Sequence, residues 1–254
     1  MGAGAPCPEA CACRVGSAEP PADTCAVIVA GGSGERFGDP RGKQFVELAG
    51  LPLMCWSIAA FEQAPSVARL VVVCAPDRAA QVEKDVLARL SLKKPVALAP
   101  SGATRQDSVL SGLGAVPRDL EFVAVHDAAR PLVEAEMIEA AIAAVRQDPA
   151  LAGAILATRS VDTLKLVEGT TIVATPDRSF YWAAQTPQVF RRRVLLAAHK
   201  AAARDEYLGT DDASLVERMG GKVRVVESSR DNIKVTLPED LALAEAALER
   251  RLLG

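Results

Sequence analysis

The sequence lacks several features that mark large classes of protein. Only two of its 254 residues are histidines, so a zinc site built from several imidazoles is almost impossible. Lys and Arg total 29 against 32 Asp and Glu, a balance that argues against a general nucleic-acid binder, which needs a basic face. No apolar run approaches the ~18 residues that cross a bilayer. We therefore expect a soluble protein with no nucleic-acid partner and no membrane segment.

The six cysteines fall into two groups. One group lies singly in apolar segments, as small core residues do: Cys25, Cys55 and Cys74. The other crowds into the N-terminal segment: Cys7, Cys11 and Cys13. A metal clip would need a fourth ligand there, so we favour a disordered extension over residues 1–23, whose composition cannot bury enough surface to order itself. This segment resembles neither a signal peptide nor a transit peptide, and a reducing cytoplasm is the expected location.

From Thr24 onward, short apolar runs alternate with longer segments of helical period. The predicted strands are 25–30, 69–75, 95–99, 121–127 and 153–158. The helix candidates between them are 52–64, 77–91, 104–116 and 134–148. This alternation predicts an α/β fold, with right-handed crossovers, a mostly parallel sheet and helices on both faces. Ligands bind such sheets at the carboxyl ends of the strands.

Residues 158–180 interrupt the alternation. Two alternating runs flank Glu168-Gly169, which predicts a β-hairpin inserted into the domain. An isolated hairpin is marginally stable in water, so we expect this arm to pack against a second copy of the chain. Beyond it we expect helices over 191–205, 212–220 and 238–252, and strands over 222–227 and 232–236. We find neither a repeat nor a linker, so residues 24–254 are interpreted as one domain.

A glycine-dense loop follows the first predicted strand. It runs from Ala30 through Gly31, Gly32 and Gly34 to Gly38. Glycines let backbone N–H groups approach phosphate oxygens, although the loop matches neither a Walker loop nor a dinucleotide fingerprint. Two cations accompany these amides, Arg36 and Lys43. The combination favours a polyphosphate ligand over a glycine turn with solvated surface charges.

The segment after the fourth predicted strand carries an acid, a histidine and an arginine. Asp127 ends a buried strand and is the expected Mg²⁺ ligand, because magnesium takes few carboxylates together with phosphate oxygens and water. For His126 we favour a structural role in the turn over general acid–base catalysis. For Arg130 we favour a structural ion pair over a ligand contact.

Six ordered segments carry a resemblance to a known family: AGGSGERFG with KQF, GATRQDSVLSGL, VHDAARP, QTPQVF, TDDAS and DNIKVT. Over nearly the whole chain after residue 24, the sequence resembles the 2-C-methyl-D-erythritol 4-phosphate cytidylyltransferases of the non-mevalonate isoprenoid pathway. The resemblance implies a Rossmann-like nucleotidyltransferase fold that dimerises through a hairpin arm. The sequence departs from the family at Gly42, where proline is usual, and glycine there leaves the free loop more flexible.

The resemblance further implies transfer of a cytidylyl group from CTP to 2-C-methyl-D-erythritol 4-phosphate, with release of pyrophosphate. The implied catalytic cations are Arg36, Lys43, Arg178 and Lys234, with Arg178 reaching in from the partner subunit. The implied CTP-binding residues are Ala30, Gly31, Gly32, Gly34, Gly102, Ala103, Arg105 and Ser108. The implied acceptor-binding residues, or their supports, are Asp127, Thr163, Arg178, Thr186, Thr210, Asp211 and Lys234. Asp127 is also the expected magnesium ligand.

The implied reaction needs no general base, because its nucleophile is a phosphate monoester that is already ionised at neutral pH. Three alternatives stay open on the sequence. A ribitol-5-phosphate or other alditol phosphate cytidylyltransferase shares the glycine loop. A catalytically silent relative is opposed by the presence of Arg36, Lys43 and Asp127. An NAD-binding oxidoreductase is opposed by the missing fingerprint.

Overall fold

The structure is a computed structural model that describes residues 20–32, 37–38 and 42–253. The N-terminal cysteines and most of the expected extension lie outside the described residues, as do Gly34 and Arg36. Near the start of the domain, the carboxylate of Asp23 forms an ion pair with Arg146 at 2.6 Å. This contact joins the start of the domain to the end of the helix Ala135–Arg146.

A seven-stranded sheet has the strand order β11-β7-β10-β6-β1-β4-β5. Its strands are β1 Thr24–Val29, β4 Val67–Cys74, β5 Val96–Pro100, β6 Phe122–Asp127, β7 Gly153–Arg159, β10 Trp182–Arg191 and β11 Val223–Glu227. Neighbours are parallel except at β10, which runs antiparallel to both β6 and β7. The predicted α/β fold and its mostly parallel sheet are confirmed.

One strand is missed and one strand prediction is wrong. The sequence analysis misses β10, because Pro187 and the polar residues around it interrupt an apolar run that would otherwise indicate a strand. It also predicts a strand over 232–236, where the described backbone is irregular. There the Val235 amide donates to the Ala129 carbonyl, and the Val235 carbonyl accepts from Lys43. The backbone of Val235 thus bonds to a loop and a side chain and not to a neighbouring strand.

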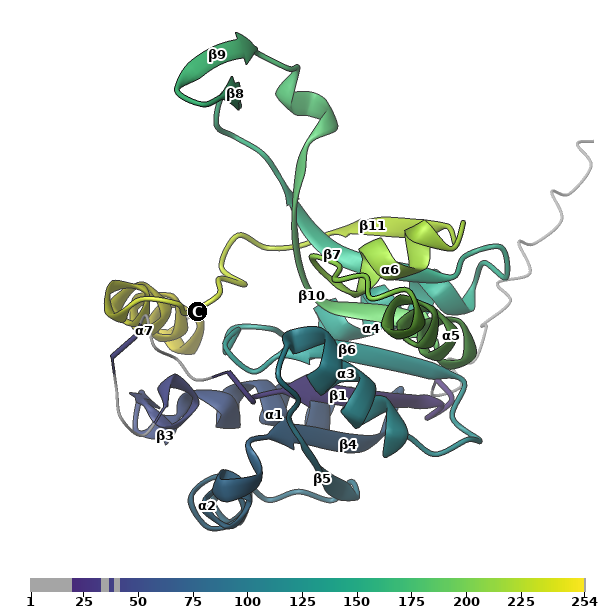
Figure 1. The fold of residues 1–254 in the computed structure, drawn as a ribbon. Coiled ribbons are helices and arrows are strands. Elements are labelled where there is room, and N and C mark those ends of the chain that lie inside the picture. The colour runs from purple at the N-terminus through teal and green to yellow at the C-terminus, as the bar shows by residue number, and fades with distance from the viewer. Residues whose placement is uncertain (1–19, 33–36, 39–41, 254) are drawn as a thin grey trace, which may run out of the picture.

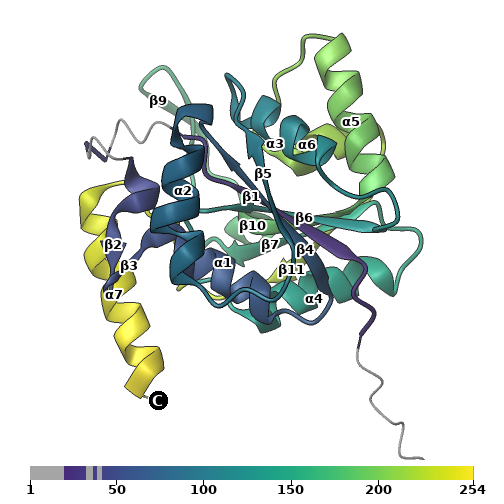
Figure 2. The same cartoon turned by 90° about the horizontal axis from the view of Figure 1, so that it is seen from below.

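Helices cover both faces of the sheet (Figure 1, Figure 2). Their bounds are α1 Leu53–Gln63, α2 Ala79–Asp85, α3 Arg105–Gly114, α4 Ala135–Arg146, α5 Arg192–Arg204, α6 Asp212–Arg218 and α7 Pro238–Leu253. Alternate residues of β1 belong to two core clusters: Ile28 lies in the one that includes residues of α1 and α4, and Val27 lies in the one that includes residues of α3, α5 and α6. Both faces of β1 are therefore buried, as its continuous apolar run predicts.

The structure differs from the predicted elements in two further places. The single helix expected over 77–91 is a short α2 between 3-10 turns at Pro76–Arg78 and Leu87–Arg89. Before α1 the chain forms a two-stranded ribbon, β2 Glu47–Leu48 and β3 Leu51–Pro52, and α7 packs against it.

In the part of the chain that is described, no helix is both long and apolar enough to cross a membrane.

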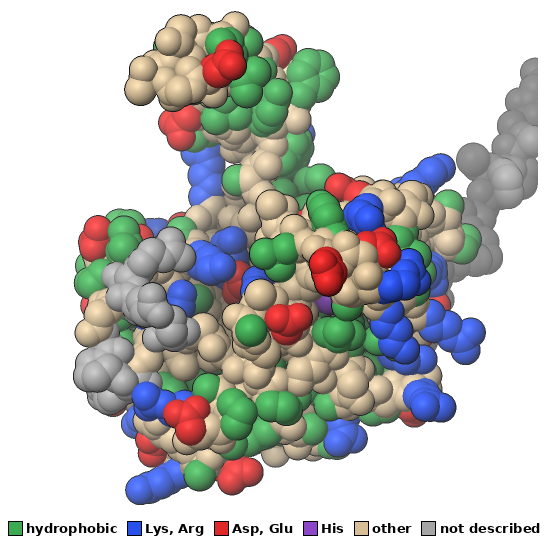
Figure 3. Space-filling view, viewed as in Figure 1, with side chains coloured by type: hydrophobic (Ala, Val, Ile, Leu, Met, Phe, Trp, Pro, Cys, Tyr) green, Lys and Arg blue, Asp and Glu red, His purple; other side chains and the backbone are tan. Residues whose placement is uncertain are grey.

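The predicted hairpin arm is present. Strands β8 Leu166–Glu168 and β9 Thr171–Ala174 pair antiparallel around Gly169. The arm projects from the body, and its side chains are exposed on both faces of the ribbon (Figure 1, Figure 3). Its large apolar side chains include Ile172 at 57% exposure and Phe180, in the 3-10 turn between β9 and β10, at 82%. Such a ribbon has little to stabilise it within one chain.

Gly153 tests how tightly the sheet packs. A Cβ at this position would lie 2.1 Å from the ring of the buried Phe190. We expect Gly153→Ala to lower the free energy of unfolding by about 1–3 kcal/mol, the usual cost of overpacking, as measured by urea denaturation. The matched control is Gly114→Ala at the end of α3, where the new methyl meets nothing within 4 Å and stability should hold or rise slightly. Equal losses in both variants would contradict the close approach at Gly153.

Candidate active site

A cleft of about 530 Å³ opens at the carboxyl ends of the central strands. From β1 the chain adds β4 and β5 on one side and then returns to add β6 on the other, so the cleft lies at the point where strand order reverses. Ten predicted site residues line it: Ala30, Gly31, Gly32, Lys43, Gly102, Ala103, Arg105, Ser108, Asp127 and Lys234. The structure therefore brings together residues that are up to two hundred positions apart in the sequence.

Glycines make the floor of the cleft possible. A Cβ on Gly31 would lie 2.2 Å from the Ser101 Cβ, and one on Gly102 would lie 2.3 Å from the Asp107 Cβ. The Ser108 hydroxyl accepts from the Gly102 amide at 3.1 Å and donates to the Thr104 carbonyl at 2.9 Å. The loop before α3 thus presents bare backbone in a fixed shape, which suits contact with an anion or a base edge.

Gly42 has a backbone conformation that proline cannot adopt. Its φ is +86°, whereas a proline ring fixes φ near −65°. The glycine at this position is therefore a conformational requirement of this loop as well as a departure from the usual family residue. Next to it Lys43 lines the cleft, and its Nζ donates to the Val235 carbonyl at 3.3 Å.

Asp127 is the electrostatic centre of the cleft. Its Oδ1 accepts from Arg105 Nε at 3.0 Å, and its Oδ2 accepts from Lys234 Nζ at 2.7 Å. Burial alone would raise the pKa of Asp127, but the two cations outweigh burial and hold that pKa far below its ordinary value. The carboxylate stays ionised at every physiological pH, with one cation on each oxygen.

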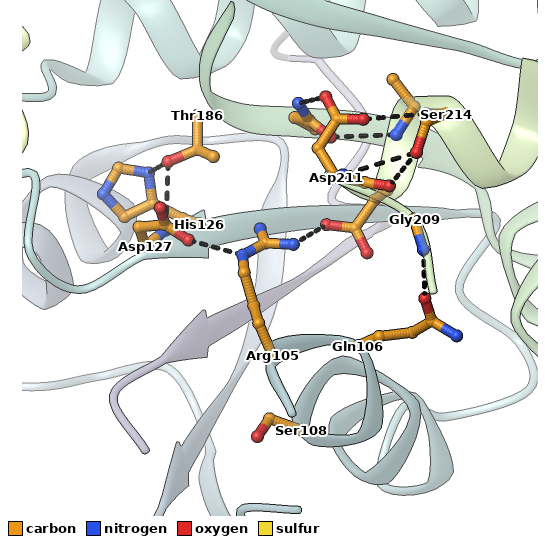
Figure 4. A network of polar contacts seen from close by, with 12 residues as sticks. Arg105, Gln106, Ser108, His126, Asp127, Thr186, Gly209, Asp211 and Ser214 are labelled. Atoms are coloured by element: carbon orange, nitrogen blue, oxygen red, sulfur yellow. Dashed lines mark hydrogen bonds and ion pairs between the residues drawn. The ribbon is translucent and has the colours of Figure 1, made fainter. Parts of the chain in front are cut away.

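Arg105 continues this network away from the cleft (Figure 4). Its Nη1 donates to Asp212 Oδ2 at 2.7 Å, and Asp212 Oδ1 lies 2.9 Å from Nε2 of His199. Burial alone would lower the pKa of Arg105, yet Asp212 and Asp127 together keep it above its ordinary value. Burial would raise the pKa of Asp212, and Arg105 and His199 lower it. The guanidinium is a permanent charge shared by two carboxylates.

His126 holds the turn behind the cleft. Its Nε2 lies 3.2 Å from the Arg130 carbonyl, so this nitrogen carries the proton, and its Nδ1 accepts from the Thr186 hydroxyl at 3.1 Å. Thr186 Oγ1 in turn accepts from the Asp127 amide at 3.0 Å. Burial lowers the pKa of His126 to about 3, so the ring is neutral at physiological pH. The structural interpretation of His126 is therefore supported.

Arg130 is structural, but its partner differs from the predicted one. Its Nη1 donates to the Asn232 carbonyl at 2.7 Å, so the partner is a backbone oxygen and not a carboxylate. Asn232 is fully buried, and its Nδ2 donates to the Thr186 carbonyl. The bond to Thr186 attaches the irregular segment that carries Lys234 to the middle of β10.

Five predicted acceptor residues do not line the main cleft. Thr186 is buried behind Asp127 and supports it. Thr210 and Asp211 line a smaller adjoining pocket of about 160 Å³, where Asp211 caps α6 through the Ser214 amide and accepts from Gln188. Thr163 lies exposed at the root of the arm. Arg178, also predicted as a catalytic cation, lies exposed near it and donates to the Val161 carbonyl, so the chain does not bring it to its own cleft.

The cleft fits a metal that arrives with a phosphate ligand better than a resident metal centre. Asp127 is the single carboxylate among the described residues that line it. Nowhere in the described ranges do three His, Cys, Asp or Glu side chains gather to hold an ion. Mg²⁺ typically takes one or two protein carboxylates with phosphate oxygens and water, and Asp127 meets that need when phosphate supplies the other ligands.

Comparison with known proteins decides the family. The family model described as IspD, 2-C-methyl-D-erythritol 4-phosphate cytidylyltransferase, matches residues 24–250. The chain belongs to the IspD family. The enzyme of that name from Geobacillus kaustophilus is 43% identical over 227 residues, which cover 89% of this chain and 97% of the relative. The one from Caldanaerobacter subterraneus subsp. tengcongensis is 41% identical over 226 residues, covering 89% and 98%.

Solved structures of IspD proteins share the fold. The 4-diphosphocytidyl-2C-methyl-D-erythritol synthase of Anaerococcus prevotii superposes with a TM-score of 0.79 at 28% identity, covering 89% of this chain and 98% of that one. The IspD of Francisella tularensis gives a TM-score of 0.73 at 28% identity, covering 88% and 99%. The nucleotidyltransferase type of α/β fold is thereby established for the chain.

Sequence reasoning missed two members of the IspD site network, Asp212 and His199. A signal for His199 exists, because the period of α5 places it on one face with Leu195, Ala198 and Ala202, all buried. An imidazole on a buried apolar face needs a polar partner. The identity of that partner, at the start of a different helix, has no signature in the sequence.

The neutrality of His126 predicts a stability that falls in acid. The folded pKa lies near 3, below the ordinary 6.5, so between these values the unfolded chain binds a proton that the folded chain excludes. Stability is then present above pH 6.5 and is lost as pH falls, by about 1.4 kcal/mol per pH unit. We expect urea denaturation from pH 6 to 4.5 to show this slope in the wild type and a shallower slope in His126→Gln. Parallel slopes would contradict the buried neutral ring, because the carboxylates contribute equally in both proteins.

Proposed function

We propose that this chain transfers a cytidylyl group from CTP to 2-C-methyl-D-erythritol 4-phosphate, giving 4-diphosphocytidyl-2-C-methyl-D-erythritol and pyrophosphate. The observation that carries the proposal is the cleft of an IspD-family chain in which Arg105 and Lys234 pair with Asp127, and Lys43 lines the same space, at the strand-order switch point. These groups supply fixed positive charge where a polyphosphate and a phosphate monoester must meet. The ribitol-5-phosphate alternative is not favoured, since the reported relatives all carry the methylerythritol name.

The nucleotide side of the cleft is built from backbone. Gly31, Gly32, Gly102 and Ala103 line the cleft with bare backbone, and Ser108 and Lys43 line it with them. Such a site reads a small base by its edge and binds phosphates through N–H groups. Lys43 neutralises charge on the α-phosphate and the departing pyrophosphate, and Arg36, outside the described residues, stays a predicted partner in that role.

The acceptor side depends on Lys234 and Asp127. The attacking phosphate is ionised already, so the difficulty is to bring it onto the phosphorus of another anion, and electrostatic stabilisation of an in-line displacement is the main task of the protein. Lys234 leaves Asp127 Oδ2, 2.7 Å away, to meet the acceptor phosphate. When Mg²⁺ is bound, Asp127 would hold it together with phosphate oxygens, and the ion would neutralise further charge.

The test of this function is pyrophosphate release. With CTP and 2-C-methyl-D-erythritol 4-phosphate we expect turnover that ATP, GTP, UTP or ribitol 5-phosphate does not support. Lys43→Ala should lower kcat by about 10²-fold, the order of loss for one preorganised cation at the developing charge. The matched control is Lys200→Ala on the exposed side of α5, which should leave kcat unchanged. Turnover with ribitol 5-phosphate in preference to the methylerythritol substrate would reject the proposal.

A homodimer through the arm is proposed to complete the site. Ile172 and Phe180 are exposed apolar side chains of a ribbon that lacks a core of its own, and a symmetric partner would cover them. The same arrangement would bring Arg178 to the cleft of the other subunit, which accounts for its distance from its own. The cytoplasmic location also stays a prediction.

Mixed dimers test the arm. Arg178→Ala and Lys234→Ala should each abolish most activity. When the two variants are coexpressed, about half of the dimers are mixed, and one of the two sites in each mixed dimer is intact, so about a quarter of wild-type activity should return. Arg178→Ala coexpressed with the Arg178→Ala, Lys234→Ala double variant is the control, since that pair forms no intact site. No recovery in the first mixture would contradict the trans arrangement of Arg178.

A further inference from the structure

Asp212 and His199 form a buried polar pair that the proposed chemistry does not use. Each side chain is 1% exposed, and neither lines the main cleft. Asp212 is the first residue of α6, and His199 lies on the buried face of α5. A buried carboxylate is costly unless charged or hydrogen-bonding partners hold it, and Asp212 has one partner on each oxygen.

Arg105 joins this pair to the cleft. Its Nη1 binds Asp212 at 2.7 Å while its Nε binds Asp127 at 3.0 Å (Figure 4). A guanidinium is a rigid planar fork, so fixing one nitrogen sets the direction of the others. With Nη1 held by Asp212, the plane of the guanidinium is fixed and Nε is directed at Asp127 Oδ1, while the second oxygen of Asp127 pairs with Lys234.

We propose that Asp212, oriented by His199, is a positioning residue for the reaction: it fixes the Arg105 guanidinium and thereby the Asp127 carboxylate. Without Asp212 the guanidinium can turn to take both oxygens of Asp127, as arginine–carboxylate pairs favour, and Lys234 loses its place. The inference rests on the proposed cytidylyl transfer. It adds two residues that act through Arg105 without touching substrate.

The His199 ring holds Asp212 through a single hydrogen bond. A carboxylate only accepts, so Nε2 of His199 carries the proton. Its Nδ1 is buried and has no hydrogen-bond partner among the described residues, so the ring contributes nothing polar except that one donor. A glutamine at this position places an amide N–H close to Nε2, whereas methionine fills similar space without a donor.

A double-mutant cycle between Asp212 and Arg105 tests the coupling. We expect Asp212→Asn to lower kcat for pyrophosphate release about tenfold while the KM for CTP changes less than about twofold. In an Arg105→Lys background the side chain has one ammonium group in place of a planar guanidinium that pairs with two carboxylates. Asp212→Asn should then lower kcat by less than about twofold. Equal factors in both backgrounds, or no change of kcat in Asp212→Asn, would overturn the proposal.

Variants of His199 decide the question if Asp212→Asn does not fold. His199→Gln should retain most of the wild-type kcat, and His199→Met should lose kcat as Asp212→Asn does. Leu195→Ala, on the same buried face of α5, is the control that should lower the melting temperature and leave kcat unchanged. Losses that follow melting temperature in all three variants would reject the positioning role.

The same assays separate the two proposals. A wild-type chain that releases no pyrophosphate from CTP and the acceptor refutes the proposed function, and the inference falls with it. An active wild type whose Asp212 and Arg105 losses are independent refutes the inference alone.

Discussion

The buried carboxylate of Asp127, held between Arg105 and Lys234, constrains most of the structure around it. Removing a charge from water is costly, and breaking a buried pair by deleting one partner typically costs about 3–5 kcal/mol. Arg105 must therefore begin α3 at the cleft, and the irregular segment with Lys234 must return across the end of β6. The second carboxylate on Arg105 then requires α6 to begin at the same place. One ionised group thus constrains the relative positions of α3, α6 and the segment that carries Lys234.

Close backbone approach is the second constraint. At Gly31 and Gly102 any side chain would enter the space of a neighbouring residue. Close packing therefore fixes the position of the backbone that lines the cleft. Gly42 shows the same dependence on conformation, because its φ of +86° is strained for other residues. Charge is supplied by a few long side chains, while shape is supplied by residues that have none.

The parts predictable from sequence are those with a local signature. Continuous apolar runs located β1, β4, β5, β6 and β7, and the glycine loop and the segment at His126 and Asp127 located the cleft. β10 was hidden because Pro187, Gln185 and Gln188 make a central strand resemble a turn. Segment 232–236 has the alternation of a strand, but Asn232 and Val235 use their polar groups on side chains and loops. The contact of Arg105 with Asp212, 107 positions apart, arises from tertiary packing alone.

The scarcity of histidine agrees with a site that works by fixed charge. Neither His126 nor His199 lines the cleft, and the pKa of His126 is too low for it to gain a proton near neutrality. The pKa of Asp127 is lowered and the pKa of Arg105 is raised, so both side chains stay charged near neutral pH. Between about pH 6 and 8 His126, Asp127 and Arg105 keep one charge state, whereas a phosphate monoester has its second ionisation near pH 6. The protein holds its charges constant, and the substrate supplies the ionisation that makes it a nucleophile.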